Sequence, residues 1–250
     1  MGGVSVVVLE DSRAVAEEAA KRVEAAARDA VAARGRFSLV LAGGSTPRAL
    51  YAILASPHVR SVVPWRRTIV LFGDERCVPP DHPDSNFHAA DESLLRHVPV
   101  LPGAVHRIVA EDPEPASAAA RYEEELRGLF PGEEAPSFDL VLLGMGADGH
   151  TASLFPRTAA LDETSRWVAV VRAPSPPVGR ITLTLPALRG ARRVLFQIVG
   201  ADKAWTAAEV FGGLPHPSPY PAERVALQSG AVEVLLDEAA AGSGAFRAHR

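Results

Sequence analysis

Short apolar runs recur along the chain, and they are continuous rather than alternating with polar residues. They are rich in valine, leucine and isoleucine, as expected for strands buried on both faces of a mainly parallel sheet. We predict strands at 5–10, 37–42, 67–73, 138–144, 167–171, 193–200 and 231–236. Segments with helical periodicity lie between them, at 12–33, 47–55, 85–97, 114–129 and 201–211. Ser12 is the expected N-cap of the first helix, and Gly35 is the residue that ends it.

The alternation of strands and helices predicts an α/β fold built on a doubly wound, mainly parallel sheet. None of the connections rich in proline and glycine is long enough to be an interdomain linker. We therefore expect one α/β domain over residues 1–238, with room for a small lobe formed by insertions in its middle. Residues 239–250, which end in GSGAFRAHR, are expected to form a flexible C-terminal tail.

Composition narrows the class of protein. With 47% hydrophobic and 22% charged residues, the 250-residue chain has the make-up of a soluble globular protein. The net charge of −4 and the scattered basic residues argue against nucleic-acid binding. The first apolar run is too short, and too soon followed by acidic residues, for a signal peptide or membrane span. A single cysteine, Cys77, suits a reducing cytoplasm, so we expect a cytoplasmic monomer or weak dimer without membrane partners.

Ligands of such sheets bind beyond the carboxyl ends of the strands, and the first loop of interest there is GGSTP. Thr46 is the expected N-cap and Pro47 the first helical residue, so backbone amides would be free to bind a phosphate or carboxylate. Gly43 and Gly44 would let a ligand approach, and Ser45 and Thr46 would add hydroxyls. A capped, tight turn without a ligand is the alternative. Ser45 as a nucleophile is a weaker alternative, because proline replaces the last glycine of that motif.

The second loop begins with Asp74, Glu75 and Arg76, directly after a predicted strand. Two carboxylates and a guanidinium there could orient hydroxyls and bind an anion, although a solvated loop with internal ion pairs has the same pattern. Further along, Asp84, Ser85 and Asn86 offer a cap for the next helix. The nearby histidines, His82 and His88, are expected on the surface, and no metal site is predicted.

The third loop, GMGADGHTASLFP, contains glycines at 144, 146 and 149 and a histidine, His150, beside an expected helix start. The glycine spacing matches a dinucleotide-binding fingerprint, but the next predicted strand ends in Arg172 where that fingerprint needs an acid. A histidine titrates near neutrality and can take a proton from water, and Asp148 could hold its ring. Later in the chain, Arg180 and Lys203 each begin an element and could together bind a phosphate.

Taken together and in this order, LAGGSTPRALY, FGDERCVPPDHPDSNF, DLVLLGMGADGHTASLFP, RITLTLPAL and GADKA closely resemble the 6-phosphogluconolactonase family. The resemblance spans about residues 4–237, and it implies a modified Rossmann-like fold, no cofactor and a place in the pentose phosphate pathway. The wider superfamily includes glucosamine-6-phosphate deaminase, which has a glutamate five residues after the loop histidine. Here that position is Phe155, which fits a lactonase.

The resemblance also implies a role for each candidate residue in hydrolysing a phosphorylated sugar lactone. His150 would be the general base, Asp148 would position it, and Arg76 would assist as an oxyanion or phosphate ligand. The residues implied in substrate binding are Gly43, Gly44, Ser45, Thr46, Asp74, Glu75, Ser85, Asn86, Arg180 and Lys203. Two alternatives stay open: a glucosamine-6-phosphate deaminase or isomerase, and a sugar-phosphate sensor without catalytic activity.

Overall fold

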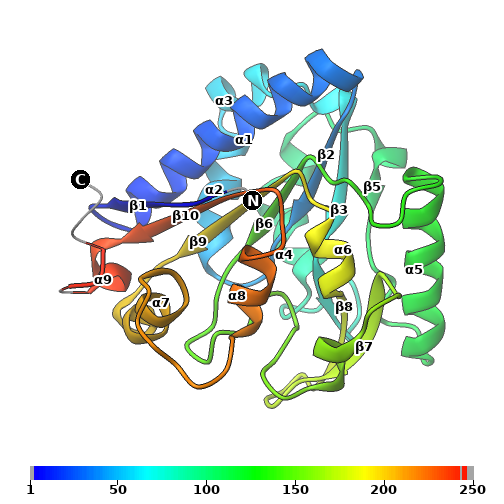
Figure 1. Ribbon diagram of the computed structural model, residues 1–250. Helices are drawn as coiled ribbons and strands as arrows, with labels where there is room; N and C mark the ends of the chain where they lie inside the picture. The colour runs from blue at the N-terminus through cyan, green and yellow to red at the C-terminus, as the bar shows by residue number, and fades with distance from the viewer. Residues whose placement is uncertain (1–2, 243, 247–250) are drawn as a thin grey trace.

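Within residues 3–242 and 244–246, which the computed structural model describes, seven parallel strands form one sheet (Figure 1). The strand order is β1-β10-β9-β6-β2-β3-β5, so the predicted doubly wound, mainly parallel α/β sheet is confirmed. The bounds are β1 (Val4–Leu9), β2 (Phe37–Leu41), β3 (Thr68–Phe72), β5 (Val105–His106), β6 (Leu140–Leu143), β9 (Arg193–Ile198) and β10 (Ala231–Asp237). Only the two-residue β5 was not predicted among them, because so short a strand has no periodicity.

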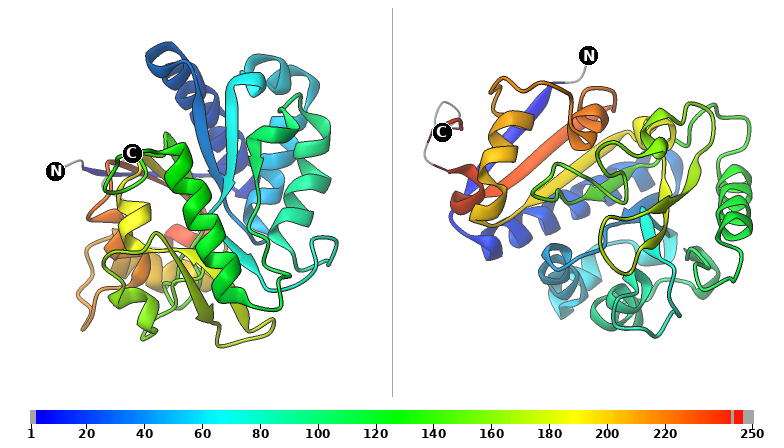
Figure 2. Two further views of the ribbon diagram at one scale, coloured as in Figure 1. Left: turned by 90° about the vertical axis from the view of Figure 1, so that its right-hand side faces the viewer. Right: turned by 90° about the horizontal axis from the view of Figure 1, so that it is seen from below.

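Helices cover both faces of this sheet. Figure 2 shows α1 (Ser12–Arg34) on one side of the strands, and α7 (Ala204–Phe211) with α8 (Pro221–Ala226) on the other. The remaining helices are α2 (Thr46–Ala55), α3 (Pro57–Val62), α4 (Asn86–Ser93), α5 (Pro115–Leu129), α6 (Leu185–Arg189) and α9 (Glu238–Ala241). Every residue of β2 and β6 is buried, which explains why these strands are almost entirely apolar, with Ser38 of β2 as the one polar residue in them.

The N-caps predicted for α1 and α2 each lie one residue after the observed ones. Helix α1 is capped by Asp11, whose side chain accepts a hydrogen bond from the amide of Ala14 at 2.8 Å, so Ser12 is the first helical residue. For α2 the N-cap position is occupied by Ser45 instead of Thr46, and no side-chain hydrogen bond caps this helix. The predicted end of α1 is confirmed, because Gly35 adopts a φ of 74° that favours glycine.

A second, three-stranded antiparallel sheet contains β4 (Asp74–Arg76), β8 (Gly179–Leu183) and β7 (Val168–Arg172), in the order β4-β8-β7. The strand predicted at 167–171 therefore belongs to this sheet and not to the parallel one. The strands β4 and β8 were not predicted. For β4 the reason is that Asp-Glu-Arg is too polar and short to look like a strand. Since β4 follows β3 after a single glycine, the small sheet presents Asp74 and Arg76 beside the end of β3.

The C-terminal prediction needs a correction as well. Instead of a flexible tail from residue 239, the structure contains α9, which Asp237 caps by accepting a hydrogen bond from the amide of Ala240 at 2.7 Å. Ala240 is fully buried and Phe246 is 5% exposed, so this segment packs onto the domain. A four-residue helix is too short for a periodic signal. The rest of the predicted tail, residues 243 and 247–250, lies outside the described residues.

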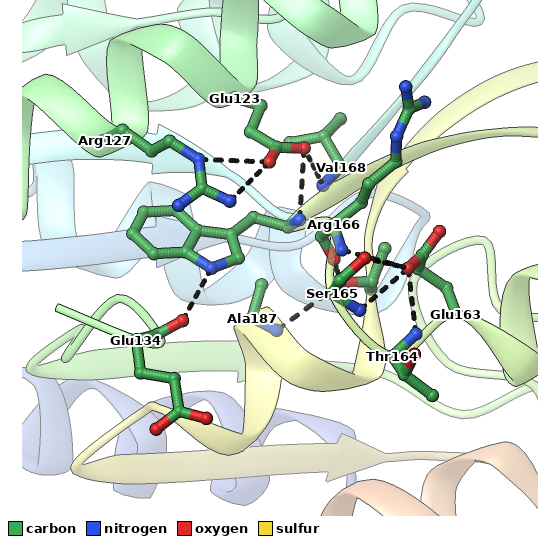
Figure 3. A network of polar contacts seen from close by, with 11 residues as sticks. Glu123, Arg127, Glu134, Glu163, Thr164, Ser165, Arg166, Val168 and Ala187 are labelled. Carbon is green, nitrogen blue, oxygen red and sulfur yellow. Dashed lines mark hydrogen bonds and ion pairs between the residues drawn. The ribbon is translucent and has the colours of Figure 1, made fainter.

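A polar network fastens α5 to the edge strand β7 (Figure 3). One carboxylate oxygen of Glu123 accepts hydrogen bonds from the amides of Trp167 and Val168, at 3.1 and 3.3 Å. Arg127 bonds the other oxygen at 2.7 Å, and its guanidinium lies 4.3 Å from the centre of the Trp167 ring. An edge strand leaves backbone donors unpaired, so Glu123 satisfies donors that could otherwise pair with another chain.

Glu163 closes the turn that leads into β7, and it gives the fold a pH-dependent contribution (Figure 3). Its Oε1 accepts hydrogen bonds from the amides of Arg166, Ser165 and Thr164, which lower the pKa of this carboxyl from 4.5 to about 2. A carboxyl with a depressed pKa stabilises the folded state above its unfolded-state pKa, and this contribution is lost as the pH falls through the folded value. We therefore expect Glu163→Gln to lower the Tm at pH 7, with the difference from wild type shrinking between about pH 4.5 and about pH 2.

The measurement is thermal unfolding of both proteins, followed by circular dichroism at pH 7 and at pH 3. Glu134→Gln is the control, because the exposed carboxylate of Glu134 accepts no hydrogen bond within the described part of the chain. It should change the Tm by the same small amount at both pH values. A Glu163→Gln effect of equal size at both pH values would contradict the role given to its carboxylate.

Candidate active site

The candidate active site lies where the order of strand addition reverses. From β2 the chain adds β3 and β5 on one side, and it then returns to add β6 on the other side of β2. Ligands of open α/β sheets bind at such a reversal, beyond the carboxyl ends of the strands. A cavity of about 210 Å³ is present there. Of the predicted site residues, it is lined by Gly43, Gly44, Ser45, Thr46, Asp74, Arg76, His150 and Lys203.

His150 is paired with Asp148 at this cavity. One carboxylate oxygen, Oδ1 of Asp148, lies 2.5 Å from Nδ1 of His150 and also accepts a hydrogen bond from the His150 amide at 3.1 Å. Burial acts to raise the pKa of the Asp148 carboxyl, but the hydrogen bonds and charge of His150 outweigh it and lower that pKa. An ionised carboxylate only accepts hydrogen bonds, so Nδ1 must carry the proton and Nε2 of a neutral ring keeps its lone pair. The pair is therefore arranged for His150 to act as a base.

The glycines of this loop make room for the histidine ring. A Cβ on Gly146 would lie 2.2 Å from both Cε1 and Nδ1 of His150, and Gly149 adopts a φ of 75°. Backbone hydrogen bonds of 2.9 Å from Gly146 to the His150 carbonyl and from Gly149 to the Gly146 carbonyl close the turn. Residues 144–158 form turns and one isolated bridge, so the helix start expected beside His150 is wrong. Without that helix, the glycine spacing does not form a dinucleotide site.

Phe155 shields one side of the base. Its ring centre lies 4.6 Å from that of His150, with the two planes at 40°, and the Phe155 side chain is 8% exposed. This is the position at which a deaminase motif has a glutamate. The structure therefore places an apolar ring beside His150 where a second acid would be needed for amine chemistry.

Asp74 is held as a fixed hydrogen-bond acceptor on the cavity wall. Asn86 donates to its Oδ1 at 3.1 Å and to its backbone carbonyl at 2.8 Å, and Ser153 donates to its Oδ2 at 2.6 Å. All three side chains are buried. A Cβ on Gly43 would lie 2.1 Å from Oδ1 of Asn86, so glycine is required for Asn86 to reach this place. Asn86 does not line the cavity and supports the site through Asp74.

Glu75 and Ser85, which the sequence also suggests as substrate ligands, do not line the cavity. The buried Glu75 carboxylate accepts hydrogen bonds from the amides of Asn86 and Phe87 at the start of α4, at 2.7 and 2.8 Å, and from the Ser85 hydroxyl at 3.0 Å. Burial raises the pKa of Glu75, although these backbone amides oppose the effect. Successive residues of a strand point to opposite faces, which is why Glu75 faces the helix while Asp74 and Arg76 face the cavity.

Cationic side chains gather beside Asp74. Arg76 and Arg180 are directly opposite each other in the β4–β8 pair, and like charges so placed destabilise a sheet. Arg180 is 7% exposed and its Nη1 has no hydrogen-bond partner among the described residues; burial, followed by the charge of Arg76, lowers its pKa. Arg180 does not itself line the cavity, whereas Lys203 does, with its Nζ 2.8 Å from Asp202. The arrangement favours an anionic ligand.

The GGSTP loop offers hydrogen-bond donors to the same cavity. Within the part of the chain that the structure describes, the amides of Gly44 and Ser45 donate no hydrogen bond, and Gly44 adopts a φ of 93°. The Ser45 hydroxyl also has no partner there, so no base activates it as a nucleophile. The loop therefore fits a ligand cradle better than a nucleophile elbow.

The sequence does not predict the role of Ser153, which lies in the loop after His150 and whose hydroxyl donates a hydrogen bond to Asp74. A serine within a turn has no distinguishing pattern, and only the fold brings it to Asp74. Among residues 3–242 and 244–246, no group of three or more histidine, cysteine, aspartate or glutamate side chains is placed to hold a metal ion. No helix in those ranges is long and apolar enough to cross a membrane.

Comparisons with known proteins agree with this geometry. The family model described as glucosamine-6-phosphate isomerases/6-phosphogluconolactonase matches residues 10–234. The 6-phosphogluconolactonase of a Nostoc species is 39% identical over 239 residues, covering 94% of this chain and 96% of the relative. That of Mycobacterium leprae is 41% identical over 243 residues, covering 95% and 97%. The solved structure of 6-phosphogluconolactonase from Trypanosoma brucei superposes with a TM-score of 0.85 at 30% identity, covering 96% and 98% of the two chains.

Proposed function

The chain belongs to the glucosamine-6-phosphate isomerase/6-phosphogluconolactonase family, and we propose that it hydrolyses 6-phosphoglucono-1,5-lactone to 6-phosphogluconate. It is a carboxylic ester hydrolase of the lactonase type, which we place in the cytoplasm and in the oxidative pentose phosphate pathway. The observation that carries the proposal is the Asp148–His150 pair at a cavity that also presents Arg76 and Lys203.

His150 acts as the general base. Its Nε2 takes a proton from a water molecule, whose oxygen attacks C1 of the lactone and forms a tetrahedral intermediate. The oxyanion is stabilised by the amides of Gly44 and Ser45 or by Arg76. When the intermediate collapses, the bond from C1 to the ring oxygen breaks and the His150 imidazolium returns the proton to that oxygen. Asp148 holds the ring through Nδ1 and balances its transient charge.

The remaining site residues bind the substrate. Lys203 and Arg76 bind the phosphate, and Arg180, which lies opposite Arg76 without lining the cavity, adds its positive charge. A dianion would offset the repulsion between the two arginines. Asp74 accepts hydrogen bonds from sugar hydroxyls, and Asn86 keeps it in place. The loop from Gly43 to Thr46 closes the cavity from the side of β2.

Two other functions are less well supported. A glucosamine-6-phosphate deaminase would need an acid near the ring, and Phe155 occupies that place. A sugar-phosphate sensor would need the cations but not a histidine whose proton is fixed by a carboxylate.

The test follows the lactone itself. It is generated in situ from glucose-6-phosphate by an oxidising enzyme, and its decay is followed by NMR with and without this protein, because the lactone also hydrolyses spontaneously. Faster decay with the protein supports the proposal. Equal decay in both samples overturns it, and ammonia release from glucosamine-6-phosphate would then favour the deaminase.

Lys203 allows the phosphate role to be tested separately. Because it would contact a part of the substrate that does not react, Lys203→Ala should raise KM about 10- to 100-fold while kcat falls less than about threefold. Lys21, the other lysine of the chain, lies exposed on α1, so Lys21→Ala is the control and should leave both constants unchanged. A large loss of kcat at constant KM would instead assign Lys203 to the chemical step.

A further inference from the structure

The turn that carries Asp148 and His150 is backed, on the side away from the cavity, by the start of α8. Tyr220 occupies the N-cap of α8 and does not line the active-site cavity. Its ring fills the space beside Gly149: a Cβ there would lie 2.2 Å from Cδ1 of Tyr220. The ring therefore packs directly on the residue between Asp148 and His150.

Two hydrogen bonds hold the same turn from outside. The amide of Ala222, in the first turn of α8, donates to the Gly149 carbonyl at 3.1 Å. The Thr206 hydroxyl, on α7, donates to the Ala147 carbonyl at 2.6 Å. The residues on both sides of Asp148 are thus tied to the C-terminal helices.

Tyr220 is held both at its hydroxyl and at its backbone amide. Its hydroxyl donates to Oε2 of Glu209 at 2.6 Å, and the Glu209 side chain is 9% exposed on α7. Its amide donates to Oε2 of Glu223 at 3.2 Å. The position of the ring is thus set by contacts with α7 and α8.

We propose that Tyr220 is a positioning residue for the reaction. It acts through Gly149 to keep Asp148 and His150 in the relative position that their hydrogen bond requires. The inference rests on the proposed role of His150 as base. The loop has glycines at 144, 146 and 149, whose backbone is less restricted than that of other residues, so contacts from outside the loop add to its own backbone hydrogen bonds in fixing it. Catalytic groups must be held to within about 0.5 Å, and a displacement of about 1 Å costs on the order of 100-fold in rate.

The test compares Tyr220→Ala with Tyr220→Phe. Both remove the hydroxyl from the buried Glu209, so both should lower the Tm, but only alanine removes the ring from Gly149. We expect Tyr220→Ala to lower kcat about tenfold with KM changed less than about twofold, and Tyr220→Phe to restore kcat to within about twofold of wild type. Leu227→Ala, at the exposed end of α8, is the control and should change neither constant. A Tyr220→Ala enzyme with wild-type kcat, or an equal loss in Tyr220→Phe, overturns the inference.

A second measurement separates this inference from the proposed function. The proton on Nδ1 of His150, held by Asp148, should give a downfield NMR signal that is absent in His150→Ala. It should persist in Tyr220→Phe and broaden in Tyr220→Ala as the turn loosens. If wild type does not hydrolyse the lactone, the proposed function fails while this signal still tests the packing; an unchanged signal in Tyr220→Ala means that Tyr220 does not position the pair.

Discussion

Replacing His150 with alanine should lower lactone hydrolysis by about 10²- to 10⁴-fold, the range that positioned acid-base catalysis contributes. The proposed mechanism uses this one ring twice, first to take the proton from water and then to return it to the ring oxygen. Asp148 cannot replace it, because the Asp148 carboxylate lies beside Nδ1 of the ring and does not line the cavity in which the lactone would bind. The proposed phosphate ligands Arg76 and Lys203 lie on other elements and should be undisturbed.

Measuring this loss requires subtraction of the spontaneous reaction. The decay of the lactone is followed by NMR with wild type, with His150→Ala and without protein, and binding of 6-phosphogluconate is measured by calorimetry. We expect binding of this product to be retained to within a few-fold. His58→Ala, which changes an exposed histidine on α3, is the matched control and should hydrolyse the lactone normally. More than a few per cent of wild-type activity in His150→Ala would show that another group is the base.

Most of the parallel sheet and the place of the site could be predicted from the sequence. Buried parallel strands are mostly apolar without alternation, and β2, β3, β6 and β9 are recognisable for that reason. The loops that follow them have glycines and functional side chains that a simple turn does not need. The sequence therefore places His150, Asp74 and Lys203 at one edge of the sheet, and in the structure all three line the same cavity.

The contacts that support these residues could not be predicted, because they join segments far apart in the chain. The sequence groups Glu75 with Asp74 and Arg76 as polar residues at one strand exit, and only the pairing of β4 with β8 shows that Glu75 faces the other way. Ser153 and Tyr220 reach Asp74 and Gly149 across the fold, and neither belongs to a local pattern. Periodicity reports which face of an element is buried, but not which partner it meets there.

Gly146→Ala should abolish most of the activity although it replaces no functional side chain. The new Cβ would stand 2.2 Å from Nδ1 of His150 and 2.7 Å from Oδ1 of Asp148, far inside van der Waals contact. The imidazole must move away, which breaks its hydrogen bond to Asp148 and misplaces Nε2. Gly146 does not have the positive φ seen at Gly149, so alanine meets no backbone strain. We expect kcat to fall about 100-fold with the Tm changed by no more than a few degrees.

The cause of that loss can be identified by a double variant. If Gly146→Ala acts only by displacing the ring, then Gly146→Ala combined with His150→Ala should be no slower than His150→Ala alone, because the two changes remove the same function. Gly144→Ala is the matched control in the same loop, since its Cβ would meet its nearest atom, the Gln197 carbonyl oxygen, at 3.9 Å. It should lose far less activity than Gly146→Ala. Wild-type kcat in Gly146→Ala would mean that the working position of the His150 ring is elsewhere, and it would remove the geometric basis for the pairing with Asp148.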